Sequence, residues 1–297
     1  MQHLNSTETN SSFTSPVPTE YLIASSVMAV CFILGVPANI TVIVRLTGWL
    51  KGGSFTPRLM LSLAISDLLS LLSMPVWIWA ALHGWDFNLV LCKGLAYLVY
   101  FSLHCSLLCV MLMSVQRYMQ VLHPEKWNKL GRKGQTILLS GVWMLSGILS
   151  SYALLHRTIE KDRKGMIQCM RGRNNAERVA TSIWEIILFV VLFPTLTYLY
   201  IHLYRGVNNS AFFSSRPLTK LVTRIVTCFI LFWIPLQISN IVIIAAVLLG
   251  NDSLLKSAVA GDSVTSVMTL INSCANPFLY AFSARALQKQ TAGIQNA

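Results

Sequence analysis

Seven long apolar stretches constrain this chain more than any other feature of its sequence. A helix needs ~20 mostly apolar residues to cross ~30 Å of hydrocarbon. Seven segments reach that length, at about 21–44, 55–82, 89–122, 135–155, 179–204, 218–249 and 254–282. Only 11% of the residues are charged, against roughly 25% in soluble proteins. The sequence therefore predicts an all-α membrane protein, a single bundle of seven transmembrane helices over residues 21–283.

The two ends of the chain predict its orientation. Residues 1–20 contain no Lys or Arg and carry N-glycosylation sequons at Asn5 and Asn10, so we expect this segment to be extracellular and glycosylated. Seven spans then place residues 284–297 inside, as a short C-terminal inner helix. The predicted inner segments hold 14 of the 23 basic residues and one acid, Glu125. This asymmetry follows the positive-inside rule and suits anionic membrane lipids at the inner surface.

Two of the seven cysteines differ from the rest in position. Five lie within apolar spans, where a small buried thiol is common. Cys92 opens the third span at its outer end, and Cys169 lies in the outer loop between the fourth and fifth spans. The oxidising exterior favours a disulfide between them, which ties this loop to the third span.

Asp67 lies near the middle of the second span, where a charge costs at least ~2.5–3.5 kcal/mol on insertion scales. We expect it to face the bundle interior. Oxygen atoms to accompany it are available from the third and seventh spans, on Ser106, Asn272, Ser273 and Asn276. Such a set suits a sodium ion or a shared proton, while a hydrogen-bonded structural acid is the alternative. No other cofactor or metal is expected.

Glu185, in the outer half of the fifth span, is the second intramembrane acid. It needs a hydrogen-bond donor, and His104, Gln237 and Asn240 are the candidates. Prolines also interrupt five of the spans, at Pro37, Pro75, Pro194, Pro235 and Pro277. In a bundle, neighbouring groups satisfy the carbonyls that a proline frees, so kinks are tolerated.

In order and spacing these landmarks resemble those of the rhodopsin-like G-protein-coupled receptors. The matching positions cover nearly the whole chain and are Asn39, Asp67, Cys92, Arg117, Tyr118, Trp143, Pro194, Trp233, Pro235, Asn276, Pro277 and Tyr280. The resemblance implies a plasma-membrane receptor that is not an enzyme. It also implies that Arg117 and Tyr118 serve the G-protein face, that Trp233 and Pro235 form a pivot beneath the ligand, and that Asn276, Pro277 and Tyr280 repack on activation.

Three positions depart from the family pattern. Gln116 replaces the acid that usually precedes the arginine, so the ion pair restraining Arg117 is absent. His202 stands where a tyrosine is common in the fifth span, and Tyr152 replaces a proline near the outer end of the fourth span.

Within the family, the segment 143–160, the FWIPLQISN run of 232–240 and the pair Arg178 and Glu185 resemble leukotriene B4 receptors and other chemoattractant receptors. The span-five proline falls one residue later than in those receptors. The resemblance implies that Arg157 and Arg178 contribute to the ligand pocket and that the G protein is of the inhibitory class.

The residues themselves favour an anionic ligand. Val99, Tyr100, Leu103 and His104 stand where an amine receptor has an acid, so amines are disfavoured. The outer loop 156–178 holds seven basic residues against three acids, and an Arg there can clamp a lipid carboxylate. The predicted ligand contacts are Arg157, Arg178, Glu185, His104, Tyr100, Asn240, Gln237 and Trp233.

Other functional classes fit less well. A peptide or other carboxylate ligand of a chemoattractant-type receptor is the first alternative. A transporter is the second, although the halves of the chain show no internal repeat. A retinal protein needs a lysine in the middle of span seven, and only Lys256 at its start is present. Neither HExxH nor GxSxG occurs, and no nucleic-acid partner is expected.

Overall fold

The fold is a bundle of long helices with one small hairpin. A computed structural model describes residues 17–49, 55–162, 165–209 and 216–295. In that part of the chain the elements are α1 (Thr19–Trp49), α2 (Phe55–Leu72), α3 (Met74–His83), α4 (Leu89–Leu122), α5 (Pro124–Ser150), α6 (Tyr152–Leu155), β1 (Arg157–Lys161), β2 (Ile167–Arg171), α7 (Asn175–Asn209), α8 (Arg216–Leu248) and α9 (Asp252–Gln295). Asn5 and Asn10 lie outside the described residues.

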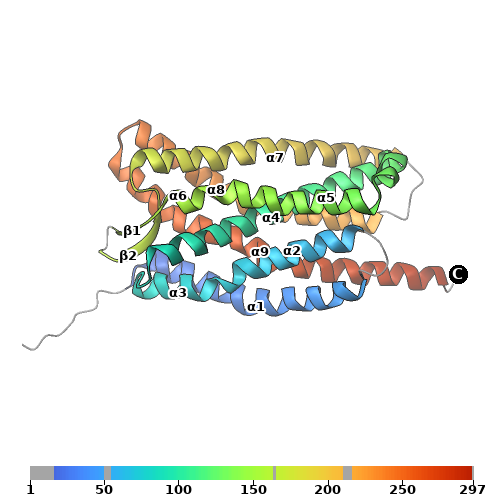
Figure 1. The fold of residues 1–297 in the computed structure, drawn as a ribbon, viewed down its shortest axis with the longest axis horizontal. Helices are drawn as coiled ribbons and strands as arrows, with labels where there is room; N and C mark the ends of the chain where they lie inside the picture. Colours follow the sequence, from blue (N-terminus) through green and yellow to red (C-terminus); the bar gives the residue numbers. More distant parts are fainter. Residues whose placement is uncertain (1–16, 50–54, 163–164, 210–215, 296–297) are drawn as a thin grey trace, which may run out of the picture.

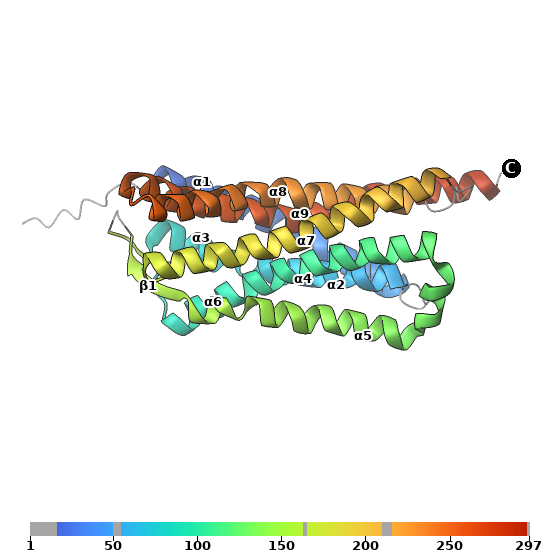
Figure 2. The same ribbon diagram turned by 90° about the horizontal axis from the view of Figure 1, so that it is seen from above.

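The long helices lie side by side along one axis (Figures 1 and 2). The described residues include seven helical segments that are long and apolar enough to cross a membrane. The predicted seven-span fold is therefore confirmed. The hairpin, α3 and α6 gather at one end of the bundle, and the C-terminus leaves at the other (Figure 1). We refer to these as the outer and inner ends.

The side chains are distributed as lipid requires. Large apolar residues point outward, with exposed fractions of 65% at Ile33 and 71% at Met144. The interior instead contains polar groups, and Asn39 and Asp67 are fully buried. Because lipid gives no hydrogen bonds, polar side chains in the spans must find partners inside the bundle. The interior is therefore where functional groups are to be sought.

Two spans break near their outer ends, which apolar length alone did not predict. The second span stops at Leu72 and restarts as α3, with Pro75 in the first turn of the new helix. Proline has no amide hydrogen to continue the preceding helix, and at the break the Ser73 hydroxyl donates to the Ser70 carbonyl at 2.7 Å. The fourth span breaks at Ser151.

The inner ends also differ in detail from the expected boundaries. Gly131 has a φ of 59°, a left-handed conformation that glycine adopts readily. It separates a short inner helical stretch of α5 from the fourth span proper. At the end of the chain the inner segment is helical, as expected, but it continues α9 without a break to Gln295.

The outer loop forms a β-hairpin that the sequence did not predict. β1 and β2 pair antiparallel, with Arg157 opposite Arg171 and Ile159 opposite Cys169. The predicted disulfide between Cys92 and Cys169 is present, with 5.7 Å between the Cα atoms. It fastens β2 to the outer end of α4 and so holds the hairpin over the mouth of the bundle.

Candidate functional site

A cavity of about 380 Å³ opens beneath the hairpin at the outer end. Its walls come from α1, α3, α4, α7, α8, α9 and both strands, and most of the lining side chains are apolar. The volume lies within the ~300–1,000 Å³ range of small-molecule sites. Of the predicted ligand contacts, the cavity wall contains Tyr100, Arg157 and Arg178. The other five lie outside the wall.

Charges of both signs line this cavity. Among the described residues, its four bases are Arg157, Lys161, Arg171 and Arg178, and its four acids are Glu20, Glu160, Asp162 and Asp262. The basic excess counted along the outer loop therefore does not carry over into the cavity. The reason is that α1 and α9 contribute Glu20 and Asp262 to the same wall. Individual cations, rather than net charge, must decide what binds.

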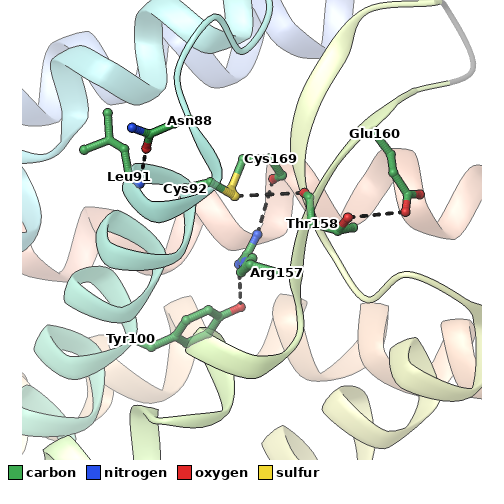
Figure 3. The surroundings of a disulfide bond; sticks show 8 residues. All are labelled: Asn88, Leu91, Cys92, Tyr100, Arg157, Thr158, Glu160 and Cys169. Atoms are coloured by element: carbon green, nitrogen blue, oxygen red, sulfur yellow. Dashed lines mark hydrogen bonds between the residues drawn. A yellow bond between two sulfur atoms is a disulfide. The ribbon is translucent and has the colours of Figure 1, made fainter.

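Arg157 reaches into the cavity from the start of β1 (Figure 3). Its guanidinium donates to the Tyr100 hydroxyl at 3.2 Å and to the Cys169 carbonyl at 3.4 Å. It also lies 5.5 Å from the centre of the Tyr100 ring, a distance at which a cation and a ring attract. No carboxylate pairs with Arg157 in the described ranges. It is therefore a positioned cation with no carboxylate at ion-pair distance, although the charge of the buried Glu185 acts on it from farther away.

Arg178 enters the wall from the first turn of α7. Gly172, at the end of the hairpin, has a φ of +74°, and a Cβ there would lie 2.9 Å from the Arg178 backbone nitrogen. Only glycine allows this close, left-handed approach. The half-buried Arg178 side chain is thereby held beside the hairpin.

Arg171 is the most heavily engaged cation of the site. From the end of β2 its Nη2 donates to Asp262 at 2.9 Å and to Asn240 at 3.0 Å. Its Nη1 lies 4.0 Å from a Glu185 oxygen. Burial alone would lower the pKa of Arg171, but the Asp262 and Glu185 carboxylates outweigh it and raise that pKa. The strand is thus tied to α7, α8 and α9 together.

The predicted partners of Glu185 are wrong. Its carboxylate accepts a hydrogen bond from the Tyr152 hydroxyl of α6 and faces Arg171. His104 instead bonds to the Ser150 hydroxyl at 2.7 Å, and Asn240 accepts from Arg171. Glu185 is only 1% exposed, so it acts on the cavity through these neighbours rather than at its surface.

The remaining predicted contacts lie deeper in the bundle. Gln237 is buried, and neither its amide oxygen nor its nitrogen has a hydrogen bond in the described part of the chain. Trp233 is 1% exposed and packs with Leu107 and Leu196. Pro235 lies within α8, between Trp233 and Gln237.

A second polar cluster surrounds Asp67 in the middle of the bundle. The Ser106 hydroxyl donates to its Oδ1 at 2.9 Å, and the Asn276 amide donates to its Oδ2 at 2.7 Å. The Ser273 side chain also interacts with this carboxyl. Asn272, which precedes Ser273 in the sequence, is also buried. Its amide oxygen has no hydrogen-bond partner among the described residues.

The third site is the inner mouth, around Arg117. Its guanidinium donates to the Thr56 hydroxyl at 2.7 Å and to Gln120 at 3.0 Å. Gln116, which replaces the family's acid, donates to the same Thr56 oxygen at 2.9 Å. No carboxylate holds Arg117 within the part of the chain that the structure describes. Arg117 is therefore held by neutral groups, Thr56 of α2 and Gln120 of its own helix, in place of an ion pair.

Of the other residues assigned to activation, Tyr118 and Pro277 are placed in full and Tyr280 only in part. The Tyr118 ring lies 5.8 Å from the His123 ring at the inner end of α4. Pro277 lies within α9 and follows Asn276. Tyr280 belongs to α9, but its side chain is outside the described positions.

Comparison with known proteins accounts for this arrangement. The family model described as "7 transmembrane receptor (rhodopsin family)" matches residues 38–280. The chain belongs to this receptor family. It is therefore a G-protein-coupled receptor of the plasma membrane, and it is not an enzyme. Ligand binding and coupling to heterotrimeric G proteins follow from family membership.

Individual relatives place the receptor in the chemoattractant group. It is 28% identical to human leukotriene B4 receptor 1 over 92% of this chain and 80% of that protein. It is 28% identical to guinea-pig (Cavia porcellus) C5a anaphylatoxin chemotactic receptor 1, over 90% and 79%. With mouse C-C chemokine receptor type 8 the identity is 28% over 93% and 82%. These ligands differ widely, so similarity alone does not select one.

Sequence reasoning missed several groups that shape the receptor's sites. Arg171 was counted only among the loop charges, and Tyr152 was noted only as a replaced proline. Asp262 carried a usable signal, because a carboxylate within the outer part of an apolar span needs a partner. Thr56 gave no such signal, since a threonine at a helix start is common.

Proposed function

We propose that this receptor binds a lipid mediator that carries a carboxylate, of the leukotriene B4 class, and signals through an inhibitory-class G protein. The observation that supports the proposal most strongly is the state of Arg157. It is a cation in the cavity wall, oriented by Tyr100 and Cys169 and with no carboxylate at ion-pair distance in the described chain. An arginine offers paired N–H donors that match a carboxylate.

The rest of the cavity suits the lipid part of such a ligand. Beyond Arg157 the wall is mainly apolar, with Val99, Leu103, Leu236 and Leu270 among its members. Burying an acyl chain there is favourable by ~25 cal/mol for each Å² removed from water. A cation at the mouth and an apolar interior together form an amphipathic site, as a fatty acid requires.

A peptide with charges of both signs is the second candidate. The observation that favours it is the set of carboxylates in the wall, including Glu160 and Asp162 at the hairpin. A peptide could place its C-terminal carboxylate on Arg157 and a basic group against these acids.

A cyclic-AMP assay in cells that express the receptor separates the two candidates. Leukotriene B4 should lower cyclic AMP, and pertussis toxin, which inactivates the inhibitory class, should abolish the effect. C-terminal peptides of chemotactic proteins should be inactive, as should a monoamine control. A response to peptides alone would reject the lipid proposal.

We also propose that a sodium ion binds beside Asp67. The supporting observation is that the amide oxygen of Asn276, whose nitrogen donates to Asp67, and that of Asn272 are buried and lack hydrogen bonds among the described residues. Leaving such atoms unsatisfied is costly. A hard cation prefers oxygen ligands of this kind, and the Asp67 carboxylate supplies the charge.

Replacing Asp67 with asparagine should therefore abolish the effect of sodium on agonist affinity. In the wild type, exchanging sodium for N-methylglucamine should change agonist affinity by roughly 5- to 150-fold, the usual range for coupled sites. Radioligand competition in the two salts measures it. An Asp252→Asn variant, altered at an exposed acid of α9, is the control. Sodium dependence that survives in Asp67→Asn would disprove the ion site.

A further inference from the structure

Arg171 and Asp262 form an ion pair inside the cavity wall. The pair is 2.9 Å long and joins the end of β2 to the outer part of α9. The Arg171 side chain is 9% exposed and that of Asp262 is 19% exposed. Both residues line the cavity. Any ligand that fills the cavity therefore meets this pair.

Asp262 engages only part of the guanidinium. The ion pair and the Asn240 contact both use Nη2. Nη1 is buried, and it has no hydrogen bond among the residues that the structure describes. A carboxylate that binds an arginine well uses both ends of the fork. The present contacts leave Nη1 without a hydrogen bond, 4.0 Å from the Glu185 carboxylate, on a side chain that contributes to the cavity wall.

The Arg171 guanidinium has contacts that do not depend on Asp262. Asn240 accepts from it, and the Glu185 carboxylate lies 4.0 Å away. Its strand is held by the disulfide at Cys169, two residues earlier. The guanidinium is thus fixed independently of Asp262, whereas Asp262 itself comes from another element.

We propose that Arg171 is a second carboxylate-binding site of the cavity, which Asp262 occupies in the ligand-free receptor and which a ligand carboxylate can take over. This proposal deepens the proposed function and rests on it for the class of ligand. It adds a residue that sets specificity: a ligand must displace Asp262 to gain Arg171. Removing Asp262 removes the competitor and leaves the site open to a small carboxylate.

The test uses chemical rescue of purified full-length receptor without its ligand. Asp262→Ala should lower the thermal unfolding midpoint in sodium chloride by about 5–10 °C, because a buried cation loses its partner. Sodium acetate at the same ionic strength should restore at least half of that loss. Wild-type receptor should respond equally to both salts.

Two further variants make the test specific. Asp252→Ala removes an exposed acid at the start of the same helix and should show no acetate-dependent change. Arg171→Ala combined with Asp262→Ala should lose the acetate effect. A midpoint of Asp262→Ala that is the same in acetate and chloride overturns the proposal, as does equal rescue in the double variant.

If Asp262→Ala does not fold, Asp262→Asn keeps the shape of the side chain without its charge. Radiolabelled leukotriene B4 should then bind Asp262→Asn at least about threefold more tightly than wild type, since no charged competitor remains. Unchanged or weaker binding overturns the proposal.

The two proposals fail in different ways. Acetate rescue without any response to leukotriene B4 would reject the lipid function and keep the Arg171 site. A lipid response that depends on Arg157, with no acetate rescue, would reject the Arg171 site alone.

Discussion

Replacing Arg157 with alanine is expected to weaken agonist binding by roughly 30-fold to several-thousand-fold, which corresponds to ~2–5 kcal/mol. The physical reason is that the ligand's carboxylate, once inside the cavity, would lose its charge partner after giving up water. Arg157 is a cation of this wall that has no carboxylate at ion-pair distance in the described chain and is oriented by Tyr100 and Cys169. Competition binding with labelled leukotriene B4, at matched surface expression, measures the effect.

Neighbouring cations supply the controls for this experiment. Lys161 also lines the cavity but is exposed at the end of β1, so Lys161→Ala should change affinity far less. Arg178→Ala should also be costly, because Arg178 is held beside the hairpin. Lys164, a further loop cation, lies outside the described residues. Equal losses of affinity in Lys161→Ala and Arg157→Ala would indicate that the ligand responds to a diffuse electrostatic field and not to a direct contact with Arg157.

A charge-preserving variant sharpens the distinction. Arg157→Lys keeps the positive charge but loses the planar fork and its contact with the Tyr100 hydroxyl. We expect it to recover only a minor part of the affinity lost in Arg157→Ala. Full recovery would mean that charge alone matters, and no effect in any variant would favour a neutral ligand.

Loss of the disulfide is expected to have the second large effect. Cys92 and Cys169 are 77 residues apart, and closing a loop of that size stabilises a fold by ~4–5 kcal/mol in the chain-entropy model. Cys92→Ser should lower the thermal unfolding midpoint and the surface expression. It should also abolish high-affinity binding, because the hairpin that carries Arg157 and Arg171 loses its anchor on α4.

Two further variants serve as controls for this prediction, the double cysteine variant and a variant of an unpaired cysteine. Cys92→Ser combined with Cys169→Ser should be no less stable than Cys92→Ser alone, because the bond is already lost. Cys228→Ser, at an unpaired cysteine of α8, should leave agonist binding unchanged. Wild-type stability and binding in Cys92→Ser would contradict the structural role of the bond.

The transmembrane spans could be predicted from the sequence, but the β-hairpin could not. Each span is a long apolar run, and lipid demands this composition whatever the neighbours are. β1 and β2 have five residues each and carry charges such as Arg157, Glu160 and Arg171. They show no apolar alternation, so nothing local marks them as strands. They pair because the chain between α6 and α7 folds back on itself, with Cys169 fixed to α4.

The candidate site was predicted less well because helix rotation is hard to read in a membrane protein. Lipid and protein interior are both apolar, so the side of a span that faces the bundle carries a weak sequence signal. His104 was one of three candidate partners of Glu185, whereas His104 bonds to Ser150 and Glu185 to Tyr152. The position of Asp67 was easier to predict, because a carboxylate in the middle of a span is stable only in the bundle interior.

The inner mouth has a consequence for how the resting receptor responds to its surroundings. An arginine held by a carboxylate is released when that carboxylate takes up a proton, so acidification of the cytosol then favours signalling. Arg117 is held by a hydroxyl and an amide, on Thr56 and Gln120, and Gln116 supplies a further amide to the same hydroxyl. None of these three groups gains or loses a proton under physiological conditions. In this receptor the described contacts that hold the arginine do not change with cytosolic acidity.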